Sequence, residues 1–141
     1  SKQEGEATSS FGDARFSAAL NGYTFLFVNE ANKDKFTAHA EMADSVFIDL
    51  GATRVIECWG DDVPDGETTD FRKAVKAKDD EAVVFSWIEW PDKQTRDAAM
   101  AKMMSEDFSD ERMDQEKNPM PFDGKRLIFG GFAPVAELKG A

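Results

Sequence analysis

Residues 81–90, Glu-Ala-Val-Val-Phe-Ser-Trp-Ile-Glu-Trp, constrain the fold more than any other segment of this chain. They are rich in Val, Ile and aromatic residues, the composition typical of a β-strand. Successive side chains of a strand point to opposite faces. One face carries Val83, Phe85 and Trp87, and the other carries Val84, Ile88 and Trp90, with Ser86 as its only polar member. Both faces are apolar, so both must be covered.

Three further strands are predicted on either side of this segment. Residues 23–27 alternate in the manner of a strand, and residues 53–59 are rich in Val and Ile. A last strand is predicted at residues 125–132, after a proline-containing loop. Residues 71–78 form either a short strand or a turn.

Two helices are predicted between these strands. The first ends at Leu50, with Gly51 as its C-terminal cap. Its apolar residues follow one helical face at spacings of four and three: Phe36, Ala40, Ala43, Phe47 and Leu50. The second begins after Asp92, a favourable N-cap residue. The resulting order, β-α-β-β-α-β, predicts an α+β, ferredoxin-like subunit with an antiparallel sheet.

This arrangement also predicts a homodimer. Two helices can cover only one face of a four-stranded sheet, and the apolar residues of the other face need a second layer. The sheet of a partner subunit is the simplest source of that layer. The expected assembly is a dimeric α+β barrel.

Composition limits the chain's partners and its location. The 141 residues carry a formal net charge of −11, with no basic run, so nucleic acid and anionic membranes are not expected as partners. No apolar run approaches the roughly 20 residues that span a bilayer. Cys58 is the only cysteine, which excludes an internal disulfide, and a cytoplasmic location is expected. We expect residues 1–18 to be a polar, mobile arm and residues 19–141 to be one domain.

Four segments resemble the YbaA-like bacterial family of unknown function (domain of unknown function 1428). They are residues 54–63 (RVIECWGDDV), 74–81 (AVKAKDDE), 83–88 (VVFSWI) and 120–126 (MPFDGKR) with the later GGF at 130–132. The resemblance covers roughly residues 21–134, and the first 18 residues are extra. It implies a ferredoxin-like subunit paired into a dimeric α+β barrel, and it implies no established activity.

The acidic loop around Asp61 and Asp62 is the most suggestive chemical feature. Clustered carboxylates can bind a hard cation, but an EF-hand pattern fails here because Val63 and Arg72 stand where oxygen ligands are required. A solvated turn explains the loop more simply. Arg126 follows a turn and can pair with Asp61 or Asp62 as a structural clasp, or with an anionic ligand. We expect no metal site.

The remaining candidate residues are few. Arg54 and Arg126 stand out as cations in an acidic chain, and Trp87 is a candidate for the wall of an aromatic pocket, although core or dimer packing also explains it. Cys58 has no basic neighbour in the sequence, and we expect it to be a small buried residue. His39 lies off the apolar stripe of its helix. One His and one Cys cannot form an ordinary zinc site. The ligand-binding candidates are therefore Arg54, Asp61, Asp62, Trp87 and Arg126, and no catalytic residue or cofactor is assigned.

Two classes of function are consistent with these features. One is a pocket between helices and sheet that binds or converts a small aromatic or oxidised metabolite without a cofactor. The other is a non-catalytic dimer that binds another protein. An enclosed cavity with convergent polar groups would favour the first class.

Overall fold

The computed structural model describes residues 19–27 and 32–141, so the predicted arm of residues 1–18 lies outside the described residues. Strands β1 (Ala19–Phe27), β2 (Arg54–Trp59), β3 (Ala82–Trp90) and β4 (Ile128–Phe132) form one sheet in the order β2-β3-β1-β4. All three pairings are antiparallel. The predicted ferredoxin-like α+β arrangement is confirmed.

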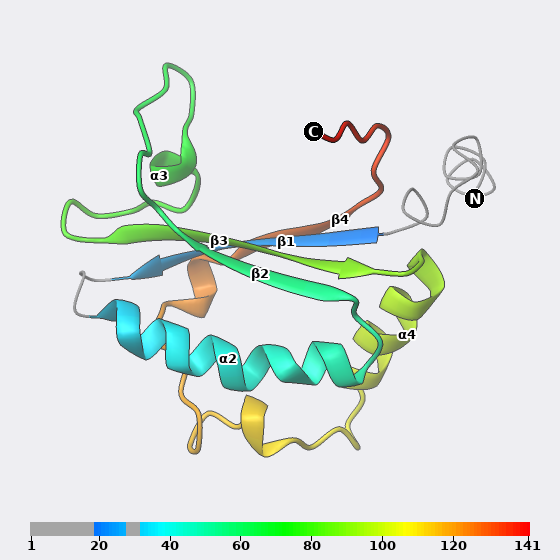
Figure 1. Ribbon diagram of the computed structural model, residues 1–141. Helices are drawn as coiled ribbons and strands as arrows, with labels where there is room; N and C mark the ends of the chain where they lie inside the picture. Colours follow the sequence, from blue (N-terminus) through cyan, green and yellow to red (C-terminus); the bar gives the residue numbers. More distant parts are fainter. Residues whose placement is uncertain (1–18, 28–31) are drawn as a thin grey trace.

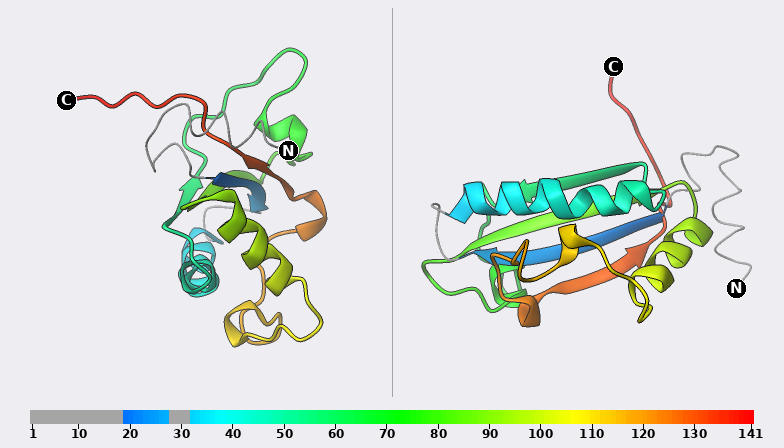
Figure 2. Two further views of the ribbon diagram at one scale, coloured as in Figure 1. Left: turned by 90° about the vertical axis from the view of Figure 1, so that its right-hand side faces the viewer. Right: turned by 90° about the horizontal axis from the view of Figure 1, so that it is seen from below.

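Helices α2 (Lys33–Asp49) and α4 (Lys93–Met103) lie on one face of this sheet (Figure 1). Seen from below, α2 runs beside β2 and β3, whereas α4 lies at one end, near β4 (Figure 2). The predicted apolar stripe of α2 is confirmed: Phe36, Ala40, Ala43 and Phe47 are buried. Gly51 caps the helix with a φ of +111°, a backbone angle that favours glycine.

The second predicted cap is also present. The side chain of Asp92 accepts a hydrogen bond from the backbone N–H of Thr95 at 2.7 Å. Several boundaries differ from the sequence prediction, and β1 begins at Ala19 rather than at residue 23. Residues 71–78 contain neither a strand nor a simple turn but the one-turn helix α3 (Phe71–Ala74), whose N-cap is Asp70. The last strand begins at Ile128, because Gly124–Arg126 form a 3-10 turn.

The core lies between the helices and the sheet. Ile88 and Trp90 of β3 pack with Phe47 of α2 and Ala99 of α4, and Val84 packs with Phe36 and Ala40. As predicted, β3 alternates between two faces. Its other face, with neighbouring residues of β2 and β4, carries exposed or half-buried apolar side chains: Ile56, Phe85, Trp87, Ile128 and Phe132.

We call this second surface the open face. The one-turn helix α3 and the loops around it lie on this side of the sheet (Figure 1), where Val75 packs on Val83. They cover only one end, since Phe85 is 38% exposed and Phe132 is 59% exposed. The opposite side of the sheet, covered by the helices, contains the hollows described next.

Candidate functional site

The five residues predicted as ligand contacts occupy three separate places. Arg54 and Trp87 meet on the open face at Glu89: the indole Nε1 of Trp87 donates to Glu89 Oε2 at 2.8 Å, and Arg54 lies 3.4 Å from the same oxygen. Arg54 and Glu89 come together because they lie directly opposite each other in the β2–β3 register. These two residues do not line either of the cavities described below.

Arg126 forms the expected clasp, but with a different partner. Its guanidinium donates two hydrogen bonds to the carboxylate of Glu81, at 2.8 Å and 2.7 Å, and a third to Asp123 at 3.1 Å. The prediction that Asp61 or Asp62 would be the partner is wrong. Glu81 is only 8% exposed, and the hydrogen bonds from Arg126 lower its pKa to about 2. Arg126 therefore holds a structural role in this molecule.

Asp61 and Asp62 are exposed, on a loop that is organised by other residues. Asp70 accepts hydrogen bonds from the backbone N–H groups of Gly66 and Lys73, at 2.9 Å and 2.6 Å. Over residues 19–27 and 32–141, no group of three His, Cys, Asp or Glu side chains is placed to hold a metal ion. The loop is thus an ordered turn with solvated carboxylates at its start.

A cavity of about 410 Å³ lies between α2 and β2. Its lining combines apolar and aromatic side chains with carboxyl groups: Phe36, Ala40, Asp44, Val55, Glu57 and Trp59. The residue periodicities of β2 and α2 bring these side chains to the cavity. Val55, Glu57 and Trp59 alternate along β2 and face the helices, whereas Phe36, Ala40 and Asp44 recur at four-residue intervals along α2.

Two carboxyl groups, Glu57 and Asp44, meet in this cavity. Burial is the largest cause that raises the pKa of Glu57, and the hydrogen bond and charge of Asp44 raise it further, to about 10. Burial also raises the pKa of Asp44, whereas its hydrogen bond with Glu57 and the nearby His39 lower it. Glu57 therefore holds the proton at neutral pH and shares it with Asp44, an arrangement known for carboxyl pairs at reactive sites.

The hydrogen bonding of Glu57 is incomplete. Its Oε2 is buried and has no hydrogen-bond partner among the described residues. An unpaired buried oxygen costs free energy, so such atoms in native proteins call for an explanation. The walls beside it are aromatic: the rings of Phe36 and Trp59 lie 6.2 Å apart, and Lys33 lies over Trp59 at 5.7 Å.

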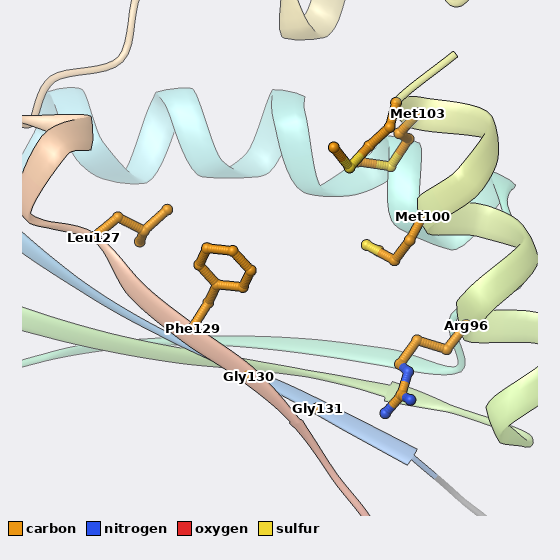
Figure 3. Close-up of a pocket in the computed structure, with 8 residues that line it drawn as sticks. Arg96, Met100, Met103, Leu127, Phe129, Gly130 and Gly131 are labelled. Carbon is orange, nitrogen blue, oxygen red and sulfur yellow. The ribbon is translucent and has the colours of Figure 1, made fainter.

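A second hollow, of about 380 Å³, lies between α4 and β4 (Figure 3). Met100, Met103, Leu127 and Phe129 line it, and Arg96 lies at its end over Gly131. Phe129 points towards the helices from β4, and Met100 points towards it from α4 (Figure 3). We call this hollow the α4–β4 groove.

Sequence reasoning missed Glu57, Asp44 and Arg96. Glu57 was not among the predicted site residues. The signal was present, because Glu57 shares a strand face with Val55 and Trp59, and an acid on the apolar face of a strand is unusual. Its meeting with Asp44 depends on the docking of α2, which sequence periodicity alone does not give.

The profile of a family described as "Protein of unknown function (DUF1428)" matches residues 20–124. The "Uncharacterized protein YbaA" of Escherichia coli strain K12 is 53% identical over 118 residues, which are 82% of this chain and 97% of that protein. The chain is thus similar to relatives whose names state no activity.

Two solved structures share the fold at low sequence identity. Both are described as dimeric ferredoxin-like proteins from an uncultured marine organism. One has 13% identity and a TM-score of 0.55, covering 86% of this chain and 98% of its own. The other has 12% identity and a TM-score of 0.53, covering 93% and 99%. Within the described residues, no helix is long and apolar enough to cross a membrane.

Proposed function

The chain belongs to the DUF1428 family of proteins of unknown function, and from this premise we propose that it is a homodimer in which each subunit binds a small phenolic compound between α2 and β2. The observation that carries the proposal is the buried, unpaired Oε2 of Glu57 in an aromatic cavity. The dimer and the ligand rest on different surfaces and are argued separately.

The dimer is supported by the open face. Phe71, Phe85 and Trp87 form a row of ring contacts across it, with centroid distances of 6.5 Å and 5.9 Å. Large exposed apolar patches mark interfaces, and a second sheet would cover this one. The two solved relatives in fold are described as dimeric, which agrees with this arrangement.

We expect light scattering at micromolar concentration to give twice the chain mass of 15.7 kDa. Phe132→Asp should weaken the dimer at least tenfold, because it buries a charge in the proposed interface. Phe129→Asp is the matched control: Phe129 lies on the same strand and is 74% exposed, but it faces the helices. A monomeric wild-type protein, or equal loss of dimer in both variants, would contradict the proposed interface.

The ligand chemistry follows from the lining of the α2–β2 cavity. Trp59 and Phe36 form an aromatic wall, and Oε2 of Glu57 offers one buried acceptor. A phenol matches both features, because it has an aromatic ring to pack on the aromatic wall and a hydroxyl group to donate to Glu57. A volume of about 410 Å³ is within the ordinary range for a small-molecule site.

The carboxyl pair also indicates a reaction step. If the ligand hydroxyl gives its proton to Oε2 of Glu57, the proton already on Glu57 passes to Asp44, and the ligand becomes a phenolate. One O–H bond breaks and one forms at each transfer, so no cofactor is needed. Burial raises the pKa of Asp44 above its ordinary value, which makes Asp44 a better final acceptor of the proton.

Saturation-transfer NMR with p-cresol tests the site, with 4-methylanisole as the matched compound that lacks a hydroxyl proton. We expect p-cresol to bind and its methyl ether to bind at least tenfold more weakly. Glu57→Leu should weaken p-cresol binding to a similar extent. Glu41→Leu, at an exposed position on the rim of the same cavity, should leave it unchanged. If the wild-type dimer binds neither compound, the proposed ligand is wrong and a non-catalytic interaction module is the better account.

A further inference from the structure

The α4–β4 groove brings large, exposed apolar side chains together. Phe129 is 74% exposed and Met104 is 85% exposed, and both border the hollow that Met100 and Met103 line from α4. Contiguous exposed apolar surface of this kind marks a binding groove. Methionine side chains are flexible and polarizable, so they adapt to apolar ligands of varied shape.

Arg96 is the only cation among the described residues that line this groove, and it lies at one end. Its side chain is only 13% exposed, and its Nε and Nη2 donate to Asp97 at 3.3 Å and 3.2 Å. Asp97 is shared, because Lys93 also bonds it at 2.5 Å. Two cations therefore face one carboxylate, and Nη1 of Arg96 has no hydrogen-bond partner among the described residues.

The strand is shaped to admit the guanidinium. A Cβ at position 131 would lie 2.5 Å from Nη1 of Arg96, so a larger residue there would push the guanidinium away from β4. In Figure 3 the Arg96 side chain extends from α4 towards Gly131, at the opposite end of the groove from Leu127. The distance from position 127 to position 131 along an extended chain is about 13 Å.

We propose that the α4–β4 groove binds a small amphipathic carboxylate, a medium-chain or aromatic acid, whose carboxylate pairs with Arg96 and whose apolar body covers Met100, Met103 and Phe129. The charge pattern supports this class of ligand over others. The guanidinium offers unused donors in the planar geometry that carboxylates prefer. Among the described residues the rest of the lining is apolar, which disfavours strongly hydrated phosphates and sugars.

Isothermal titration of the full chain with octanoate tests this site, with octanol as the uncharged probe of equal length. We expect saturable octanoate binding, with octanol and the Arg96→Gln variant each at least tenfold weaker. Arg96→Lys should lie between them, because it keeps the charge but loses the planar fork. Gly131→Ala should also weaken octanoate, since the new methyl group displaces the guanidinium.

Arg54→Gln is the matched control, because Arg54 lies on the open face and should not affect octanoate. Glu57→Leu should also bind octanoate normally, which separates this site from the proposed phenol cavity. Equal affinity of the Arg96→Gln and wild-type proteins, equal affinity for octanol, or no saturable binding would each overturn the proposal. A loss of dimer in Phe129→Asp would overturn it too, by placing the groove in an interface.

Discussion

Glu81→Gln is expected to lower the free energy of unfolding by about 2 to 3 kcal/mol, one of the largest losses available from a single neutral substitution in this chain. The side chain of Glu81 is almost fully buried and receives both terminal nitrogens of Arg126. It also accepts the backbone N–H of Lys78 at 2.7 Å. The substitution removes the charge that these donors surround and leaves the guanidinium with only Asp123 as a charged partner.

Urea unfolding at fixed protein concentration measures this loss, and the Glu81→Gln/Arg126→Gln double variant measures the coupling. Lys117→Gln is the control, since its pair with Glu111 is exposed on both sides. It should change stability little. Additive effects of the two substitutions at positions 81 and 126 would show that the clasp does not act as a pair.

The Glu81–Arg126 pair also predicts how stability changes with pH. The pKa of Glu81 in the folded protein is about 2, below its ordinary value of 4.5. The folded state therefore binds fewer protons at this group than the unfolded state between those values. Its stabilisation is fully present above about pH 4.5 and is lost as the pH falls towards 2. Glu81→Gln should remove this part of the acid sensitivity.

Glu57→Gln is expected to have the opposite effect and to raise stability at neutral and alkaline pH. The pKa of Glu57 is raised in the folded protein, from 4.5 to about 10, mainly by burial. The unfolded chain ionises this group from about pH 4.5 upwards, whereas the folded protein keeps it protonated. Wild-type stability should therefore fall as the pH rises above about 4.5, by roughly 1.4 kcal/mol per pH unit until Glu57 ionises in the folded protein.

Glutamine has nearly the same shape and does not ionise, so the variant should escape this fall. The two proteins should unfold at similar urea concentrations at pH 4, and the gap should widen at each higher pH. Glu41→Gln, at the exposed rim of the same cavity, is the control and should follow wild type. Equal pH dependence in wild-type and Glu57→Gln proteins would show that Glu57 is ionised and solvated. A gain in stability with a loss of p-cresol binding would be the trade-off expected of a functional site.

Much of the fold follows from local sequence patterns. The two-faced apolar pattern of β3 and the four-and-three spacing of α2 predict a sheet with helices on one side, because burial follows residue periodicity. The caps at Gly51 and Asp92 mark helix ends through short-range backbone chemistry. The helix α3 was not predicted, because one turn carries too few residues to establish a period.

The site was harder to predict, since its contacts join distant segments. Arg126 pairs with Glu81 across 45 residues, whereas the partners predicted from the sequence, Asp61 and Asp62, are exposed to solvent. A cluster of acidic residues in a sequence suggests a binding site, but such a cluster is most often a solvated turn. The chemically distinctive acid is Glu57, which lies outside any acidic cluster in the sequence. Burial under α2 raises its pKa.

The order β2-β3-β1-β4 has a consequence for how the chain folds. The central strand β1 is made first, yet both of its neighbours come much later: Ala19 pairs with Trp90, and Leu20 pairs with Phe132. As the chain leaves the ribosome, β1 has no strand to bond until β3 has emerged, and its second edge stays open until β4 follows. Pairings so distant in sequence are slow to form. Until they form, the earliest strand of the sheet presents two unpaired edges, which makes the nascent chain a natural client for chaperones.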